Sequence, residues 1–188
     1  MPTDSQYEAM ERLQWSIDFS RQFPENVFRG QWIEMLFFDC DRIFHREFAN
    51  LARELLLAEG ASSICMCGHH QSAADSPETQ SFFFLDEGET PELYISFLAR
   101  EWIVLMGRFG LISNVGRWCI YTERAQEFAV IAIRDSAIRE SARPIIDKLG
   151  ALRIESALEN PPSFGLTSRG LTQEGRKRLI EAYQASNI

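Results

Sequence analysis

The sequence is short of cysteine and contains no long apolar run. Its 188 residues include only four cysteines, whereas a disulfide scaffold is normally shorter and richer in cysteine. The longest apolar runs, "MLFF", "FFFL" and "WIVLM", fall well below the roughly twenty residues that a membrane helix needs. The polar, acidic start "MPTDSQYEAMERLQ" has no basic segment followed by an apolar stretch, as a targeting signal would. We therefore expect a soluble, cytoplasmic protein without membrane contact.

Motifs for catalysis are also missing. The sequence has no glycine-rich phosphate loop, no G-x-S-x-G and no H-E-x-x-H, each of which carries a defined chemical mechanism. We therefore predict that the protein is not an enzyme, has no catalytic residues and needs no cofactor.

Apolar spacing predicts several helices within one domain spanning residues 1–188. From Ile33 to Leu55, apolar residues recur every three or four positions, which places them on one helix face. We predict a helix over 41–59, stopped by Gly60, while the aromatic-rich segment 31–38 stays open between helix and strand. Further helices are expected around "YEAMERLQW" and over 91–110, 136–149 and 173–185, with Ser136 and Thr172 as caps and Gly150 as a stop.

Apolar and β-branched runs between turn residues predict strands. "SSICMC", ended by Gly68, and "SFFFL" are separated by a polar loop, and "DEGETP" follows as a turn. "RWCIYTE" and "EFAVIAIRD" are expected to form an antiparallel hairpin. Taken in chain order, these elements predict an α+β domain with a small, mainly antiparallel sheet and helices packed over it.

A cluster of cysteine and histidine in "SSICMCGHH" raises the question of a metal site. Zinc takes about four ligands, and structural sites usually draw them as pairs from separate segments. Here Cys65, Cys67, His69 and His70 lie within six residues, and His45 is the only other histidine. We expect two buried cysteines on a strand and two solvent-facing histidines in the next loop, and we predict no metal. A nucleophilic cysteine is disfavoured because the flanking sequence is acidic.

The segment "FFDCDRIF" resembles the first motif of haloacid-dehalogenase-like phosphatases. That resemblance implies a nucleophilic Asp39, a general acid/base Asp41 and a magnesium ion beside them. The sequence departs from the family pattern at Arg42 and Ile43, and no later paired acidic motif completes the magnesium site. The helical spacing around this segment also argues against a strand that ends at Asp39. A metal-dependent hydrolase therefore stays an alternative, against two surface aspartates on different faces of a helix.

The charges are unevenly distributed along the chain. Between Arg53 and Arg100 there is no lysine or arginine but there are eight acids, which equals the whole net charge of −8. Loops are exposed, so this acidity is expected at the surface. It either keeps the protein soluble or recognises a positively charged partner. The acids lack the spacing of a calcium loop, and repulsion of phosphates disfavours nucleic acid as a partner.

The segment "GLTQEGRKRLIEAY" near the C-terminus resembles the final helix of some winged-helix regulators. The resemblance covers about fourteen residues, and the same residues are also ordinary capping chemistry at a helix start. No basic recognition helix lies upstream. A winged-helix transcriptional regulator is therefore a second alternative.

The hairpin segment "GRWCIYTERAQEFAVIAI" resembles a segment of bacterial toxin-immunity proteins, including the partners of contact-dependent growth inhibition toxins. It spans about eighteen residues. The resemblance implies inhibition by binding: an acidic protein covers the basic surface on which a toxin nuclease holds nucleic acid. No residue roles transfer by motif, so we predict the contacts from charge. The predicted partner-binding residues are Asp75, Glu78, Asp86, Glu87, Glu89 and Glu92.

Overall fold

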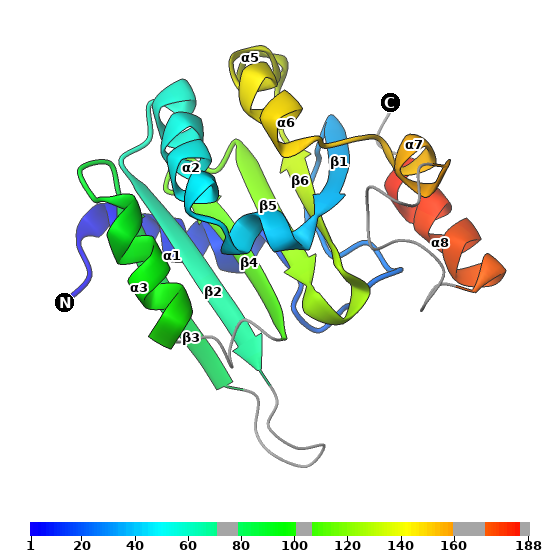
Figure 1. Ribbon diagram of the computed structural model, residues 1–188, viewed down its shortest axis with the longest axis horizontal. Coiled ribbons are helices and arrows are strands. Elements are labelled where there is room, and N and C mark those ends of the chain that lie inside the picture. The colour runs from blue at the N-terminus through cyan, green and yellow to red at the C-terminus, as the bar shows by residue number, and fades with distance from the viewer. Residues whose placement is uncertain (71–78, 101–106, 160–171, 185–188) are drawn as a thin grey trace.

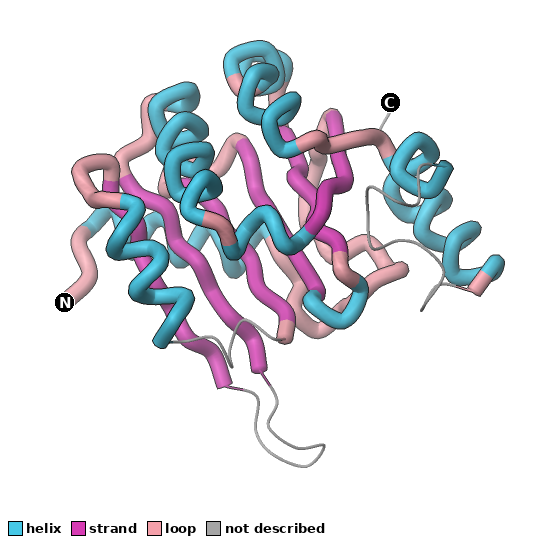
Figure 2. Tube along the Cα trace, in the orientation of Figure 1, coloured by secondary structure: helices cyan, strands magenta, loops and turns pink. Residues whose placement is uncertain are grey.

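The computed structural model describes residues 1–70, 79–100, 107–159 and 172–184. Its centre is a six-stranded, fully antiparallel sheet with the order β1-β6-β5-β4-β2-β3 (Figures 1 and 2). The strands are β1 (Glu34–Asp39), β2 (Ser63–His70), β3 (Thr79–Asp86), β4 (Arg108–Ser113), β5 (Trp118–Glu123) and β6 (Phe128–Ile133).

Helices cover both faces of this sheet and one of its edges. Helix α1 (Asp4–Ser16) lies on one face, across β2 and β4. Helices α2 (Arg46–Glu59), α3 (Pro91–Arg100), α5 (Ser136–Ser141) and α6 (Arg143–Leu149) lie on the opposite face, and α7 (Ile154–Glu159) and α8 (Gln173–Gln184) flank β1 (Figure 1). The predicted α+β class, with helices packed over a mainly antiparallel sheet, is confirmed.

The core is built around the two central strands. Every residue of β5 and β6 is buried, because helices or loops cover both faces at the middle of the sheet. The predicted hairpin is confirmed, with Trp118 opposite Ile133 and Glu123 opposite Phe128. A strand buried on both faces needs apolar residues at successive positions, which explains the unbroken run "FAVIAI".

Helix α1 packs so closely on the sheet that β4 needs a glycine beneath it. A Cβ atom at Gly110 would lie 2.3 Å from Cδ1 of Ile17, just after α1. Two apolar atoms cannot approach that closely, so the absence of a side chain at position 110 sets the distance between α1 and the sheet.

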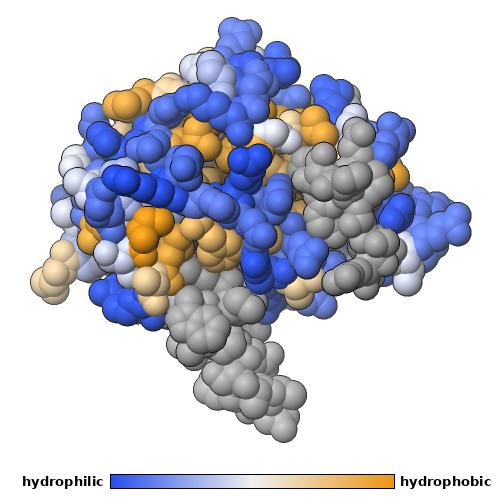
Figure 3. All heavy atoms as spheres, in the orientation of Figure 1, coloured by the Kyte–Doolittle hydropathy of each residue, from blue (hydrophilic) through white to orange (hydrophobic). Residues whose placement is uncertain are grey.

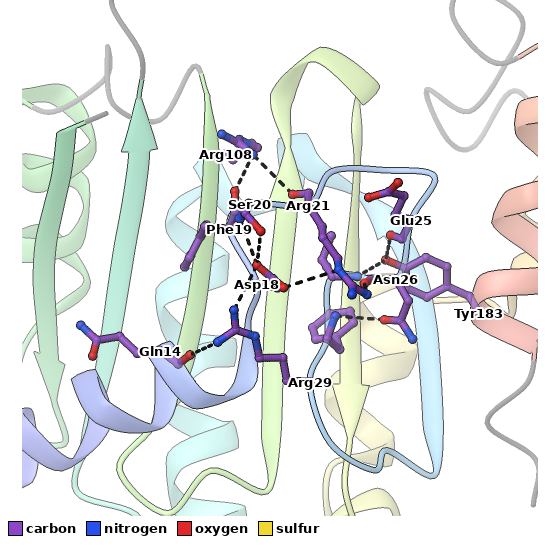
Figure 4. A network of polar contacts seen from close by, with 12 residues as sticks. Gln14, Asp18, Phe19, Ser20, Arg21, Glu25, Asn26, Arg29, Arg108 and Tyr183 are labelled. Atoms are coloured by element: carbon purple, nitrogen blue, oxygen red, sulfur yellow. Dashed lines mark hydrogen bonds and ion pairs between the residues drawn. The ribbon is translucent and has the colours of Figure 1, made fainter. Parts of the chain in front are cut away.

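The loop after α1 is held against the same face by polar contacts (Figure 4). Asp18 pairs with Arg29 at 3.1 Å, and a hydrogen bond from Ser20 holds the pKa of Asp18 below its ordinary value. Arg108 donates to the carbonyl of Phe19 at 2.6 Å. Tyr183 of α8 donates to the carbonyl of Glu25 at 3.0 Å. These contacts join the loop to β4 and to α8.

A buried carboxylate anchors this loop from the sheet side. Glu123 at the end of β5 is 5% exposed and accepts hydrogen bonds from the Phe23 N–H at 2.7 Å and the Tyr121 hydroxyl at 2.8 Å. Burial raises the pKa of Glu123 above its ordinary value because the charged form loses hydration.

The segment around residues 31–59 corrects the predicted boundaries. Residues 34–39 form strand β1, a short 3₁₀ helix (Cys40–Phe44) follows, and α2 begins only at Arg46. Asp39 starts the 3₁₀ helix by accepting the N–H of Asp41 at 2.8 Å. The prediction that no strand ends at Asp39 was therefore wrong, and so was the placement of Asp39 and Asp41 on one helix. The predicted stop at Gly60 is confirmed, with φ of 70°.

Two other predicted helices differ from the structure. The helix expected over 91–110 ends at Arg100 within the described residues, and Arg108–Ser113 is strand β4. Residues 101–106 lie outside the described part of the chain. The helix expected over 136–149 is two short helices that meet at Ala142. The predicted cap at Ser136 was wrong, because Asp135 caps the first helix by accepting the Ile138 N–H at 3.0 Å. The predicted stop at Gly150 and the final helix with its Thr172 cap are confirmed.

Candidate partner-binding surface

Four of the six predicted partner-binding acids lie together at one end of the sheet. Asp86 is the last residue of β3, Glu87 and Glu89 lie in the turn between β3 and α3, and Glu92 is in the first turn of α3. This turn is at one side edge of the molecule, at the level of the start of β2 (Figure 1). Asp75 and Glu78 lie outside the described residues.

These four acids are not equally open to a partner. Asp86 is half-buried and accepts hydrogen bonds from the Gln6 side chain at 2.8 Å and the Ser63 hydroxyl at 2.5 Å. Glu92 is exposed and paired with Arg46. Hydrogen bonds from its own backbone N–H and from Thr90 hold the pKa of Glu92 below its ordinary value. Asp86 therefore holds the β3–α3 turn in place through its hydrogen bonds, and the charge of Glu92 is already paired within the chain.

The remaining two acids present charge outward. Glu87 is exposed, and Glu89 is half-exposed while accepting the Asp86 N–H at 2.9 Å. Neither forms an ion pair with any residue that the structure describes. Among the described residues, no base therefore neutralises their charge.

Helix α1 brings further acids to the same place. The bond from Gln6 to Asp86 sets the start of α1 beside the β3–α3 turn. Asn114 also links α1 to the β3–α3 turn. Its side chain donates to Glu8 at 3.4 Å and accepts the Ser62 N–H at 3.1 Å. The Ser62 carbonyl in turn accepts the Glu87 N–H at 3.1 Å. We call the resulting surface the acidic rim, defined as Asp4, Glu8, Glu11, Glu87 and Glu89.

Two exposed aromatic side chains extend the acidic rim along α1. Trp15 is 77% exposed and Tyr7 is 45% exposed. Trp15 follows Glu11 by four positions, so both lie on the outer side of α1, opposite the buried Ala9 and Leu13. The distribution of charge along the chain does not reveal these aromatic residues, whereas the spacing of Asp4, Glu8, Glu11 and Trp15 by three or four positions places them on one helix face.

The rim contains little balancing positive charge. Arg12 is the single base of α1, and its side chain lies against Gly116 in the turn between β4 and β5, with Cδ 3.1 Å from where a Cβ of residue 116 would be. In the described part of the chain, no acid of the rim is ion-paired. The surface therefore combines net negative charge with large, exposed aromatic rings.

The strand end at Asp39 is a second cluster of chemical groups. Side-chain atoms of Asp39, Cys40 and Asp41 lie within 4.8 Å of one another. Asp41 is paired with Arg124, whose guanidinium lies 4.9 Å from the centre of the Phe44 ring. Burial raises the pKa of both Asp39 and Cys40. Asp39 thus caps the 3₁₀ helix, and Asp41 forms an ion pair with Arg124.

The cysteine and histidine cluster is part of a longer strand than expected. Strand β2 runs through Gly68 to His70, so the prediction of two solvent-facing loop histidines was wrong. His69 is buried and stacks on Phe19, with ring centres 5.2 Å apart. The side chain of His70 lies outside the described part.

The two cysteines of β2 are buried, as predicted. Cys65 and Cys67 point toward α1 on the same face as His69, and burial raises the pKa of both thiols. Among described residues, only Asp39, Cys40 and Asp41 form a cluster close enough for a metal.

A hollow of about 630 Å³ lies between α2 and α6. Hydrophobic residues gather between these helices, bordered by hydrophilic residues (Figure 3). Its charged lining includes Arg42, Glu54 and Lys148, and Lys148 pairs with Glu54 at 2.8 Å. Because positive and negative groups alternate there, the hollow favours no ligand of one charge.

Comparisons with known proteins give no match to a protein-family model, a curated protein or a solved structure. Within the described residues, no helix combines the length and the apolar character that crossing a membrane requires.

Proposed function

We propose that the protein is an immunity-type inhibitor that binds and neutralises a cognate toxin through the acidic rim and the adjoining aromatic residues. The observation that carries this proposal is the pairing of unbalanced acids with Trp15, which is 77% exposed. Isolated apolar residues at a surface are common, but a large aromatic ring beside a single-sign charge cluster is typical of a binding surface.

Each part of this surface has a distinct physical role in binding. Unpaired carboxylates on Asp4, Glu8 and Glu87 attract a basic partner and increase the rate of encounter. Trp15 supplies apolar area that a partner pocket can bury, and tryptophan and tyrosine are enriched among residues that dominate binding energy. The acids thus select the partner, and the ring retains it.

A nuclease fits this surface as a target because it needs positive charge to hold phosphates. An acidic protein that covers or adjoins that positive surface excludes the nucleic acid by occupying its place and by repelling it. This mechanism needs no catalytic group or cofactor and acts where the toxin does, in the cytoplasm. Direct binding of nucleic acid by this protein is disfavoured by the same charge.

The hydrolase and regulator alternatives remain predictions with weaker support. A hydrolase would use Asp39 and Asp41, but both carboxylates already make contacts that explain their positions. A winged-helix regulator would use α8, but Tyr183 and Leu179 of that helix are buried. Metal analysis of the purified protein and a gel-shift with genomic DNA fragments test these two alternatives.

Co-expression with the reading frame immediately upstream in the source genome tests the proposed function. We expect that frame to be toxic alone, harmless together with this protein, and to co-elute with it. Charge reversal at the five rim residues is expected to abolish protection. A control variant reverses three acids on α7 and α8, near the opposite edge of the sheet: Glu155, Glu174 and Glu181. Protection that survives reversal of the rim would refute the surface assignment.

The six acids predicted from sequence provide a second set of variants. Reversing Asp75, Glu78, Asp86, Glu87, Glu89 and Glu92 should weaken binding and reduce its dependence on salt. Unchanged affinity and unchanged salt dependence in that variant would count against the acidic loops. Because Asp86 holds the β3–α3 turn in place, the folding of this variant is checked by thermal denaturation before its binding is measured.

A further inference from the structure

Strand β3 forms one outer edge of the sheet. Its hydrogen bonds show which of its backbone groups point toward β2 and which point outward. The Glu87 N–H donates to Ser62 at 3.1 Å, across from β2. Backbone groups alternate in direction along an antiparallel strand. The backbone N–H and C=O groups of Ser81, Phe83 and Leu85 therefore point toward β2. Those of Gln80, Phe82 and Phe84 point away from the sheet.

At the opposite edge of the sheet, outward backbone groups of β1 are already hydrogen-bonded within the chain. At β1, the backbone of Phe37 exchanges two hydrogen bonds with Leu152, at 2.7 and 2.8 Å. At β3, the outward N–H of Asp86 is satisfied by the side chain of Glu89. No described residue bonds to the outward backbone groups of Gln80, Phe82 or Phe84.

The side chains of β3 do not protect this edge. Edge strands in natural proteins usually carry lysine, proline, a bulge or an inward charge that prevents further pairing. The strand "TQSFFFLD" has none of these before Asp86, and its eight residues pair with β2 without a bulge. Phe83 stacks on Phe97 of α3 with ring centres 4.1 Å apart, which holds the strand flat against the helix.

We infer that the free edge of β3 receives an extended, basic segment of the partner as an added strand. This inference rests on the proposed function and specifies how the partner binds. Strand addition supplies affinity through main-chain hydrogen bonds and specificity through alternate side chains. Phe82 and Phe84, which lie opposite Cys67 and Cys65 and are half-buried, offer an apolar surface beside the added strand.

Charge decides between a basic partner and a second copy of this chain. No lysine or arginine occurs between Arg53 and Arg100, Glu78 immediately precedes the strand in sequence, and Glu87 and Glu89 follow it. Pairing of two β3 strands, parallel or antiparallel, would set acidic ends against acidic ends, which is destabilising. A partner strand with lysine or arginine at its ends meets opposite charge at both.

Proline at position 80 tests the inference without disturbing the sheet. Gln80 is exposed and its N–H points outward, so Gln80→Pro removes a donor from the free edge only. Gln80→Ala is the matched control that keeps the N–H. Thermal denaturation of both variants confirms that each is folded.

The probe is a fluorescein-labelled peptide, Lys-Val-Lys-Val-Lys-Val-Lys, with the glutamate analogue Glu-Val-Glu-Val-Glu-Val-Glu as its charge control. We expect the basic peptide to bind, with affinity reduced roughly fivefold to tenfold in Gln80→Pro but not in Gln80→Ala, and the acidic peptide not to bind. Binding should protect the amides of Gln80, Phe82 and Phe84 from hydrogen exchange. Equal affinity in the two variants, or no binding of the basic peptide, would overturn the inference.

The same variants separate this inference from the proposed function. If Gln80→Pro and Gln80→Ala bind the toxin equally well, the strand-addition inference is wrong while the inhibitor proposal stands. If the basic peptide binds the edge but no toxin is neutralised, the proposed function is wrong while the edge site stands. A dimer in sedimentation that Gln80→Pro abolishes would identify a second copy as the occupant and overturn the assignment of a basic partner.

Discussion

Replacing Trp15 by alanine should weaken partner binding far more than it weakens the fold. Trp15 is 77% exposed, so about a quarter of its surface is covered by the chain. For a side chain of about 250 Å² this is ~60 Å², worth at most about 1.5 kcal/mol of folding free energy. The exposed part, ~190 Å², is available to a partner. A buried tryptophan at the centre of an interface typically contributes about 2–4 kcal/mol.

These magnitudes predict a dissociation constant that rises roughly 30-fold to 1,000-fold in Trp15→Ala. The assay is calorimetric titration of the co-purified partner, with thermal denaturation of the free protein alongside. Leu57→Ala is the matched control, because Leu57 is an exposed apolar residue (58%) on α2, across the sheet from α1. The reasoning is refuted if Trp15→Ala changes affinity by less than about threefold, or no more than Leu57→Ala does.

Three further predictions concern the fold. Gly110→Ala should destabilise the protein by about 1–3 kcal/mol in urea denaturation, because the added methyl meets Ile17; a loss under about 0.5 kcal/mol would show that α1 is loosely packed. Glu123→Gln should stabilise the protein at neutral pH, measured in the same way, because the amide avoids the cost of burying a charged carboxylate. Because burial raises the pKa of Glu123, the stability that its carboxyl group contributes is fully present below its unfolded-state pKa and is lost as pH rises through its folded-state pKa. The difference in stability between Glu123→Gln and the wild type should therefore vanish toward acidic pH. A difference that stays constant with pH would contradict this prediction. Cys65 and Cys67 should resist thiol reagents until the protein unfolds, because burial raises their pKa values, and rapid labelling of native protein would contradict this.

Local signals in the sequence predicted the hairpin of β5 and β6, the helix stops at Gly60 and Gly150 and the Thr172 cap, whereas long-range packing decided what was missed. Strands β5 and β6 follow each other through a short turn, so their pairing needs no information from elsewhere. Strand β4 overlaps the end of the helix predicted over 91–110, because glycine is typical of helix termination and Gly107 and Gly110 stand at that end. The role of Gly110 is instead to admit Ile17, which lies more than ninety positions earlier in the sequence.

The spacing of apolar residues indicated a helix where the structure has strand β1. Its four central residues are all buried, because the strand is covered on both faces, so it lacks the alternation that identifies a half-exposed strand. Phe37 and Phe44 happen to continue the spacing of α2. Asp39 then ends the strand and caps the next turn, a signal that the sequence contains but that apolar periodicity conceals.

The candidate surface was predicted in part. The charge gap between Arg53 and Arg100 identified the β3–α3 turn, where Glu87 and Glu89 are open to a partner. The contribution of α1 depends on a hydrogen bond between Gln6 and Asp86, eighty residues apart, which charge counting cannot reveal. The exposure of Trp15 follows from the face on which Leu13 is buried, and a helical projection of α1 would have indicated it.

The most direct test of the acidic rim is the salt dependence of partner affinity after its charges are removed. The variant combines Asp4→Asn, Glu8→Gln, Glu11→Gln, Glu87→Gln and Glu89→Gln, which keeps side-chain size, and affinity is measured at low and high salt. We predict that the wild type binds more weakly as salt rises, and that the variant binds weakly at both concentrations with little dependence on salt. An affinity and salt dependence equal to those of the wild type would contradict the account.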